Sequence, residues 1–123
     1  MGERNTKEAV EMRAAVWRRR VQAELERILA RLKEHPNVLR VILFGSLARG
    51  ECRRGSDLDL VIVQRTDKRF LDRLDEFYRL LAPTVETDIL VYTPSEWDEL
   101  RRDRAFVRRI AGEGVVLYES AVS

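Results

Sequence analysis

The chain has 123 residues, of which 45% are hydrophobic and 36% are charged. This composition is typical of a single globular domain, and it excludes a disordered chain. It also excludes a membrane-spanning protein, because no apolar run approaches the roughly 20 residues that a bilayer requires. The net charge of +2 is too small to indicate stable binding to nucleic acid.

Cysteine and histidine are almost absent from the sequence. Cys52 is the only cysteine and cannot form an internal disulfide, which favours the cytoplasm. His35 is the only histidine, so a metal site built from cysteine or histidine pairs is excluded by counting. The first residues, Met1 to Thr6, contain no apolar segment of a signal peptide.

A long amphipathic helix is predicted over residues 7–34. Apolar residues recur there at spacings of three and four, which places them on one side of a helix. These residues are Val10, Ala14, Trp17, Val21, Leu25, Ile28 and Leu32. We expect the core to cover this stripe, and an interface with another chain is the alternative. His35-Pro36 ends the helix, since proline disfavours helix in the residue before it.

Alternating strands and helices follow the long helix. Residues 38–44 are predicted to be a buried strand, residues 46–50 a short helix and residues 57–64 a second strand. Asp67 is predicted to cap the next helix, which covers residues 68–82.

The last third of the sequence continues this alternation. Residues 85–92 are predicted to form a third strand. Thr93-Pro94-Ser95-Glu96 is typical of a capping box with proline at the first helical position, so a helix begins there. Asp103-Arg104 marks a break in this helix, and residues 115–118 form a closing strand. The order of elements predicts an α/β (α+β) fold, in which helices pack on one face of a small mixed sheet.

Two carboxylates stand on the second predicted strand. Asp57 and Asp59 share one face of it, because successive strand side chains point to opposite sides, and their Cα atoms lie about 6.5–7 Å apart. Leu58, Leu60 and Val61 surround Asp59, which makes the position costly for an unpaired charge. A Mg²⁺ ion would offset both charges, since it prefers carboxylate oxygens. A polar strand edge or a closing turn is the alternative interpretation.

A glycine–serine turn precedes this strand. Gly45 lets the backbone approach a phosphate closely, and exposed N–H groups at a helix N-terminus attract anions. Ser46 can cap the helix or bond to a phosphate oxygen. Arg49 lies one turn later and can reach the same phosphates, or pair with Glu51 instead. Metal ligands and anion donors that converge in this way indicate a nucleoside triphosphate site.

The arrangement of these residues resembles a known signature. Gly45-Ser46, ten intervening residues and Asp57-x-Asp59 are similar to the signature of the DNA polymerase β-like nucleotidyltransferase superfamily. The fuller form, G-S-x-A-R-G followed by S-D-x-D-L, resembles its smallest branch, the minimal nucleotidyltransferases (MNT). Many of those are antitoxins encoded beside HEPN-domain proteins. The resemblance in motif and element order covers residues 38–118.

The resemblance implies the fold and the domain organisation of that superfamily. We expect a polymerase β-like nucleotidyltransferase core, which is a small mixed sheet with helices packed on it. The whole chain, residues 1–123, would form one nucleotidyltransferase domain. Residues 7–34 would be its N-terminal helix, and residues 38–118 would be its catalytic core.

The resemblance also implies a third acidic residue on a neighbouring strand. Asp88 opens an apolar stretch and is the candidate, and Glu86, which shares its strand face, is the rival. The implied catalytic and metal-binding set is Asp57, Asp59 and Asp88. The implied nucleotide-binding set is Gly45, Ser46 and Arg49. Two Mg²⁺ ions would serve as cofactors, with ATP as the substrate, in a two-metal nucleotidyl transfer.

The same resemblance suggests the acceptor. It implies a protein adenylyltransferase that moves AMP from ATP onto a hydroxyl of a partner protein, expected to be a HEPN toxin. The chain would be the antitoxin of the pair and would form a homo- or hetero-oligomer. One alternative is a non-catalytic antitoxin that acts by occlusion, and another is transfer to a small molecule such as an antibiotic. The choice of ATP rests on analogy, since no residue in the sequence indicates which base is bound.

Overall fold

The computed structural model describes residues 3–48, 57–106, 108 and 114–121. Its elements are α1 (Glu3–Glu34), β1 (Val38–Phe44), α2 (Gly45–Ala48), β2 (Leu58–Gln64), α3 (Phe70–Leu81), β3 (Thr87–Tyr92), α4 (Pro94–Leu100), α5 (Arg104–Phe106) and β4 (Val115–Glu119). The predicted mixed α/β fold and the long N-terminal helix are confirmed. Within the described ranges, no helix has both the length and the apolar character that crossing a membrane requires.

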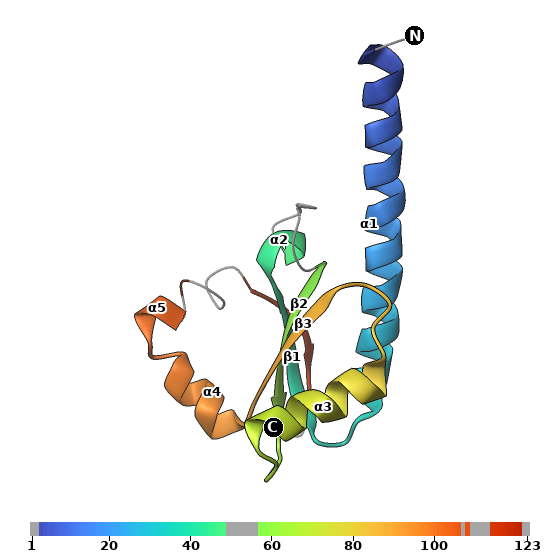
Figure 1. Cartoon of the computed structure of the whole chain (residues 1–123). Helices are drawn as coiled ribbons and strands as arrows, with labels where there is room; N and C mark the ends of the chain where they lie inside the picture. Colours follow the sequence, from blue (N-terminus) through green and yellow to red (C-terminus); the bar gives the residue numbers. More distant parts are fainter. Residues whose placement is uncertain (1–2, 49–56, 107, 109–113, 122–123) are drawn as a thin grey trace.

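The four strands form one mixed sheet. Their order is β3-β2-β1-β4, so β3 and β4 are its edges (Figure 1). β2 and β3 run parallel and are joined by α3, whereas β1 pairs antiparallel with both β2 and β4. Since β2 and β3 run in the same direction, both strands begin at the same end of the sheet, which is where the candidate active site lies.

Apolar residues on both faces of the sheet give the molecule two cores. The face covered by α1 and α3 buries the larger cluster, which includes Val41, Leu60 and Phe77. The opposite face buries a smaller cluster in which Val61 packs with Trp97 of α4. The expectation that helices pack on one face is therefore wrong. The strands are apolar at consecutive positions, so both of their sides need cover.

The two halves of α1 have different surroundings. Its C-terminal half docks on the sheet, where Val21, Leu25, Ile28 and Leu32 are buried. Its N-terminal half extends past the rest of the molecule, and Val10 is 55% exposed there (Figure 1). The core therefore covers the predicted apolar stripe from Trp17 to Leu32 and leaves Val10 outside it.

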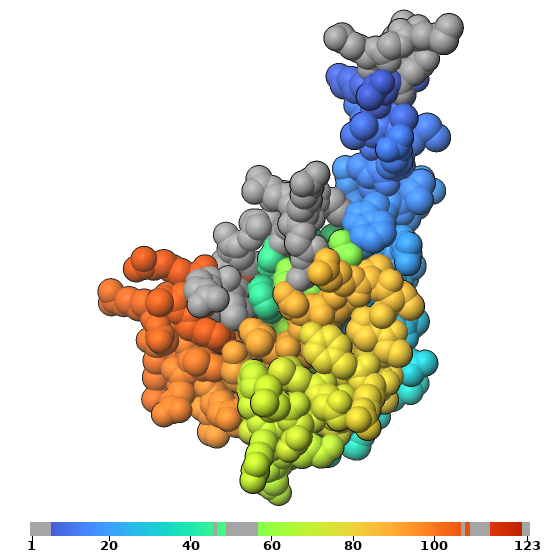
Figure 2. Space-filling view, viewed as in Figure 1, coloured from blue at the N-terminus to red at the C-terminus, as the bar shows by residue number. Residues whose placement is uncertain are grey.

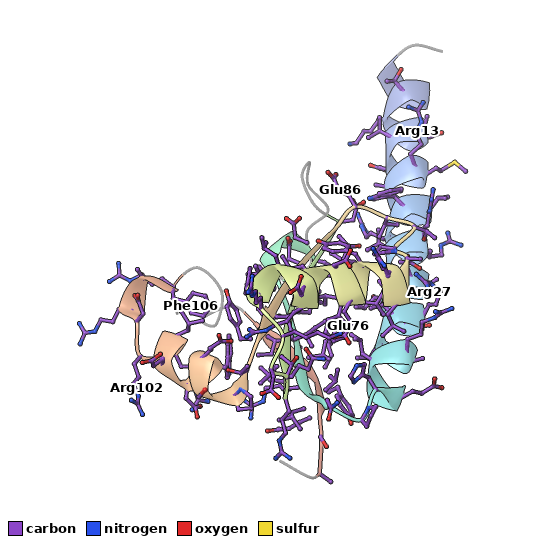
Figure 3. All side chains as sticks on the ribbon, turned by 60° about the horizontal axis from the view of Figure 1, so that its bottom comes forward. Arg13, Arg27, Glu76, Glu86, Arg102 and Phe106 are labelled. Atoms are coloured by element: carbon purple, nitrogen blue, oxygen red, sulfur yellow. The ribbon has the colours of Figure 1, made fainter. Side chains whose placement is uncertain are left out.

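A group of contacts that we call the α1–α3 clamp (Glu24, Arg27 and Thr84) fastens α1 to the end of α3. Arg27 donates from Nε and Nη2 to the Glu24 carboxylate at 2.6 and 3.0 Å. Its Nη2 also donates at 2.8 Å to the Leu81 carbonyl, which has no partner within the helix. Figure 3 shows Arg27 beside the C-terminal end of α3. Glu24 in turn accepts the Thr84 N–H. The hydrogen bond from Arg27 lowers the pKa of Glu24 to about 2, against the opposing effect of burial.

The start of α3 differs from the prediction. Asp67 does not cap this helix, whose N-cap is Arg69 without a side-chain hydrogen bond. Arg73 holds the turn instead, because its Nε donates to the Lys68 carbonyl at 2.8 Å. Arg73 is also buried and pairs with Glu96 of α4 at 2.6 Å, so it links the turn to the opposite side of the sheet. This long-range ion pair is not visible in the sequence.

The starts of α4 and α5 follow the sequence closely. Thr93 Oγ1 accepts the Glu96 N–H at 3.3 Å, and the Glu96 carboxylate accepts the Thr93 N–H at 2.8 Å, so the predicted capping box is confirmed. The predicted break at Asp103 is also confirmed. Its carboxylate accepts the N–H groups of Ala105 and Phe106 at 2.9 and 3.3 Å, which starts α5.

Candidate active site

The predicted carboxylates lie where β2 and β3 begin. The parallel pairing of these strands makes Asp59 and Asp88 direct neighbours. Both side chains therefore project from the same face of the sheet. Asp59 is half-buried, and Asp88 is exposed. The fold thus brings together two acidic residues that the sequence separates by a whole helix.

Asp57 is tied to the residue before β3. It lies one position before β2, and its backbone N–H donates to the Glu86 carbonyl at 2.8 Å. The Asp57 carboxylate accepts the Glu86 N–H at 3.2 Å. Glu86, the rival to Asp88, is itself exposed. Its backbone therefore helps to hold Asp57 at the end of the sheet where the other carboxylates lie.

Gly45 lies directly against Asp59. Its φ of 78° is in the left-handed region that favours glycine. A Cβ atom at this position would lie 3.1 Å from the Cγ and 3.4 Å from the Cβ of Asp59, and closer still to a carboxylate oxygen. Only a residue without a side chain fits, so the turn that opens α2 approaches the carboxylate closely. Such a cradle is suited to phosphate oxygens and to a cation that neutralises them.

The donor set suits a hard cation, but it does not form an assembled metal centre. Three carboxylates supply the oxygen ligands that Mg²⁺ prefers. Among the residues that the structure describes, however, no group of three or more histidine, cysteine, aspartate or glutamate side chains is placed to hold a metal ion. Metal binding by Asp57, Asp59 and Asp88 therefore stays a prediction.

Part of the predicted nucleotide-binding set lies outside the described residues. Arg49 belongs to this part, and so does the side chain of Ser46. The backbone of Ser46 lies in α2, so the predicted short helix after β1 is present. The contacts of both side chains with phosphate stay predictions.

Tyr78 is a site-supporting residue that sequence reasoning missed. Its hydroxyl donates to the Thr87 carbonyl at 2.9 Å and accepts the Ile89 N–H at 3.2 Å. These two backbone groups flank Asp88 on the edge strand β3. Tyr78 thereby fixes the backbone on either side of the predicted third carboxylate. No sequence signal could have found this role, because it depends on how α3 packs beside β3.

Comparison with known proteins places the chain in a family. The sequence profile of the nucleotidyltransferase domain matches residues 25–114, which is nearly three quarters of the chain. The chain belongs to the nucleotidyltransferase domain family. This membership confirms the resemblance drawn from the motif, and the matched range includes every predicted catalytic and nucleotide-binding residue. A search of curated proteins finds no match.

Solved structures share the nucleotidyltransferase fold. A crystal structure from Sulfolobus solfataricus, provisionally assigned as a nucleotidyltransferase, is 23% identical with a TM-score of 0.60, covering 83% of each chain. A toxin–antitoxin structure with AMP-PNP is 21% identical with a TM-score of 0.52, covering 79% of this chain and 74% of the other. At these identities the likeness shows the fold.

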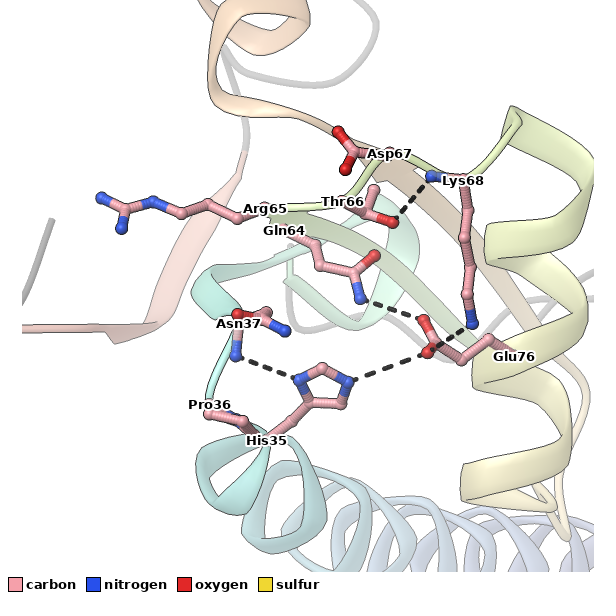
Figure 4. A pocket seen from close by; sticks show the side chains of 9 residues that line it. All are labelled: His35, Pro36, Asn37, Gln64, Arg65, Thr66, Asp67, Lys68 and Glu76. Carbon is pink, nitrogen blue, oxygen red and sulfur yellow. Dashed lines mark hydrogen bonds and ion pairs between the residues drawn. The ribbon is translucent and has the colours of Figure 1, made fainter.

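A large hollow of this nucleotidyltransferase domain lies away from the candidate active site. It has a volume of about 860 Å³ and lies at the opposite end of β2, beside Gln64 and His35 (Figure 4). Glu76 in its wall accepts from Gln64 Nε2 and Lys68 Nζ, both at 2.9 Å. Burial raises the pKa of Glu76, but these hydrogen bonds outweigh it and lower the pKa overall. Of the predicted site residues that the structure describes, none lines this hollow.

Proposed function

We propose that the protein is a Mg²⁺-dependent adenylyltransferase that moves AMP from ATP to a hydroxyl of a partner protein. The observation that carries the proposal is the close approach of Gly45 to Asp59, next to Asp88 on the adjacent strand. A phosphate cradle and paired carboxylates at one end of a sheet, in a member of the nucleotidyltransferase family, are the parts that this reaction needs.

Each residue has a proposed role in the transfer. Asp57, Asp59 and Asp88 would hold Mg²⁺, which supplies positive charge to the triphosphate and acidifies the attacking hydroxyl. The Gly45 turn, with the Ser46 and Arg49 side chains, would orient the phosphates so that the hydroxyl meets the α-phosphorus in line. The new oxygen–phosphorus bond forms as the bond to pyrophosphate breaks. Asp88, which is exposed, would accept the hydroxyl proton.

We propose a toxin as the acceptor protein. One structural neighbour is a toxin–antitoxin complex with AMP-PNP, which supports an adenine nucleotide and a toxin partner. The motif resemblance to the minimal nucleotidyltransferases makes a HEPN protein the specific choice. The chain would then be the antitoxin, and the cytoplasm would be the compartment in which the pair meets.

A second candidate is an antitoxin that binds and occludes its partner without catalysis. The toxin–antitoxin structural neighbour supports this candidate as well, because an antitoxin can act by binding alone.

Transfer of label from α-³²P-ATP tests the proposal. The chain is incubated with ATP and Mg²⁺ in a lysate of its native host, and labelled proteins are separated by mass. Asp59→Asn should remove the label, whereas Asp98→Asn, an exposed carboxylate on α4, should leave it unchanged. Wild-type labelling by a folded Asp59→Asn chain would contradict the site assignment. Absence of any labelled protein, despite Mg²⁺-dependent ATP binding, would favour occlusion or a small-molecule acceptor.

A further inference from the structure

A second, smaller hollow lies at the end of the sheet opposite to the candidate active site. It has a volume of about 230 Å³ and lies between the start of β1, the end of β2 and α4. The space-filling view shows α4 on the side of the molecule away from α1 (Figure 2). Sites for small organic molecules usually measure roughly 300–1,000 Å³, so this hollow is suited to a small ion or to the end group of a larger molecule.

Three arginines from three different parts of the fold lie in the wall of this hollow. We call it the arginine hollow, after Arg40, Arg65 and Arg101. Arg40 pairs with Val63 across β1 and β2, so its side chain shares the face of Val63, which α4 covers. Arg65 follows β2, and its side chain points away from the other side chains that line the large hollow (Figure 4). Arg101 is the C-cap of α4. The fold therefore brings together three positive charges that the sequence separates.

Two carboxylates in the same wall offset only part of this charge. Glu119 accepts from Arg40 Nη2 at 2.6 Å, and Asp98 Oδ1 lies 3.5 Å from Arg101 Nη2. The Arg65 guanidinium has neither a hydrogen bond nor an ion pair within the part of the chain that the structure describes. Three arginines against two carboxylates leave one positive charge in the wall, and the arginine without a carboxylate is Arg65. Its guanidinium carries only N–H donors, in a fork that matches an oxyanion.

The wall also contains a buried donor without an acceptor. Trp97 is 4% exposed, and its Nε1 has no hydrogen-bond partner among the described residues. An indole N–H only donates, and a buried donor that stays unpaired lowers stability. A group that satisfies both the Trp97 N–H and the Arg65 guanidinium must be an acceptor, and the charge of Arg65 favours an anion.

We propose that the arginine hollow binds a phosphate group, either as inorganic phosphate or as the end group of a small phosphate ester. A phosphate group offers three acceptor oxygens and about two negative charges, so it bonds to Arg65 and to the Trp97 N–H at once. A carboxylate offers two oxygens, and both are used when a guanidinium binds it through two hydrogen bonds. Of the predicted site residues that the structure describes, none lines the arginine hollow, so this proposal does not depend on nucleotidyl transfer.

The indole N–H resonances of the ¹⁵N-labelled full chain test the proposal. The chain has two tryptophans, and Trp17 lies elsewhere, on α1 with Arg20 above its ring. Inorganic phosphate, added without Mg²⁺, should shift the Trp97 resonance and leave the Trp17 resonance in place, with a Kd below about 5 mM. Trp17→Phe assigns the two resonances. A Trp97 resonance that stays unmoved at a tenfold higher phosphate concentration would overturn the proposal.

Substitution of Arg65 tests whether this residue holds the phosphate. Arg65→Gln should weaken binding at least tenfold, and it should leave the fold intact because it removes no side-chain contact within the described chain. Arg102→Gln is the matched control, because Arg102 is exposed and adjacent to Arg101 but does not line the hollow. It should leave the Kd unchanged. Equal effects of the two substitutions would overturn the assignment.

Two other ligands test the chemistry of the bound group. Acetate should bind at least tenfold more weakly than phosphate, and equal Kd values would overturn the choice of phosphate over a carboxylate. Phenyl phosphate, a monoester, distinguishes the two sources of the group. A lower Kd than that of inorganic phosphate would assign the hollow to the end group of a larger molecule, and an equal or higher Kd would assign it to the free ion.

Discussion

The α1–α3 clamp and the candidate active site hold their carboxylates in different surroundings. In the clamp, Glu24 is 5% exposed and is bound by the Arg27 guanidinium and the Thr84 N–H. At the active site, Asp59 and Asp88 lie side by side on adjacent strands, and Asp88 is exposed. Glu24 is buried and held by groups of its own chain, so we expect the clamp to contribute to the stability of the fold. Asp88 is open to solvent, so a ligand can reach it from outside, as the proposed transfer requires.

The largest effect is expected from filling the cradle at the active site. Gly45→Ala places a Cβ against the Asp59 carboxylate and puts alanine in the left-handed region, which costs about 1–2 kcal/mol. Because a small displacement of the reacting groups slows a reaction strongly, the rate of AMP transfer should fall about 100-fold. Label transfer at saturating ATP measures the loss, and urea unfolding checks that the variant is folded. A folded variant with wild-type transfer would show that the close approach is not needed.

Breaking the clamp should lower the stability of the fold without changing the candidate active site. Glu24→Ala leaves the Arg27 guanidinium and the Thr84 N–H without their carboxylate, and should lower the free energy of unfolding by about 3 kcal/mol. Glu26→Ala, an exposed position on the same helix, is the matched control and should change it by less than about 0.5 kcal/mol. Urea unfolding measures both variants. Equal losses of unfolding free energy in the two would show that the clamp does not stabilise the fold.

Acid should weaken the clamp in a defined pH window. The pKa of Glu24 is lowered from 4.5 to about 2 in the folded chain, so its contribution is present above pH 4.5 and is lost as the pH falls toward 2. Since Arg27 is one-third exposed, solvent screens its interaction with Glu24. We therefore expect the free energy of unfolding to fall by about 2 kcal/mol, which is less than the full pKa shift would give. Unfolding measured between pH 6 and 2.5 should show a smaller fall in Glu24→Gln than in wild type. An equal fall in the free energy of unfolding for Glu24→Gln and wild type would show that Glu24 does not cause the acid sensitivity.

The smallest effect is expected at the support of Asp88. Tyr78→Phe removes two hydrogen bonds to the backbone of β3 and should cost about 1–2 kcal/mol of stability. If Tyr78 positions Asp88, kcat should fall several-fold while the KM for ATP stays unchanged. Tyr118→Phe, on the far edge strand β4, is the matched control. A loss of stability without any change in kcat would make Tyr78 a structural residue only.

Local patterns account for what could be predicted from the sequence. The strand at 38–44 and the capping box that begins at Thr93 are found as predicted, because apolar runs and caps act within a few residues. The apolar runs around Asp59 and Asp88 predict a strand at each residue, and the parallel pairing of β2 with β3 makes the two residues neighbours. The strands that carry the site thus follow from local sequence, whereas the distance between the carboxylates follows from the sheet topology.

Long-range contacts account for what could not be predicted. The clamp joins Glu24 to Thr84, sixty positions away, and nothing in a stretch of alternating charges on α1 distinguishes Glu24 from Glu26. Asp67 had the right residue type for a cap, but Arg73 holds that turn from within the helix. The second core, around Trp97, could not be predicted, because local sequence does not indicate which face of the sheet α4 covers.

The position of β4 has a consequence for how the protein is made. β4 pairs with β1, and the Arg40–Glu119 ion pair joins residues 79 positions apart. Contacts so distant in sequence form late, because the closure of a long loop is entropically costly. During synthesis, β1 therefore has an open edge until residues 115–119 emerge, and an open edge is a template for pairing with other chains. The arrival of β4 is expected to be both the slow step of folding and the step that protects the nascent sheet from aggregation.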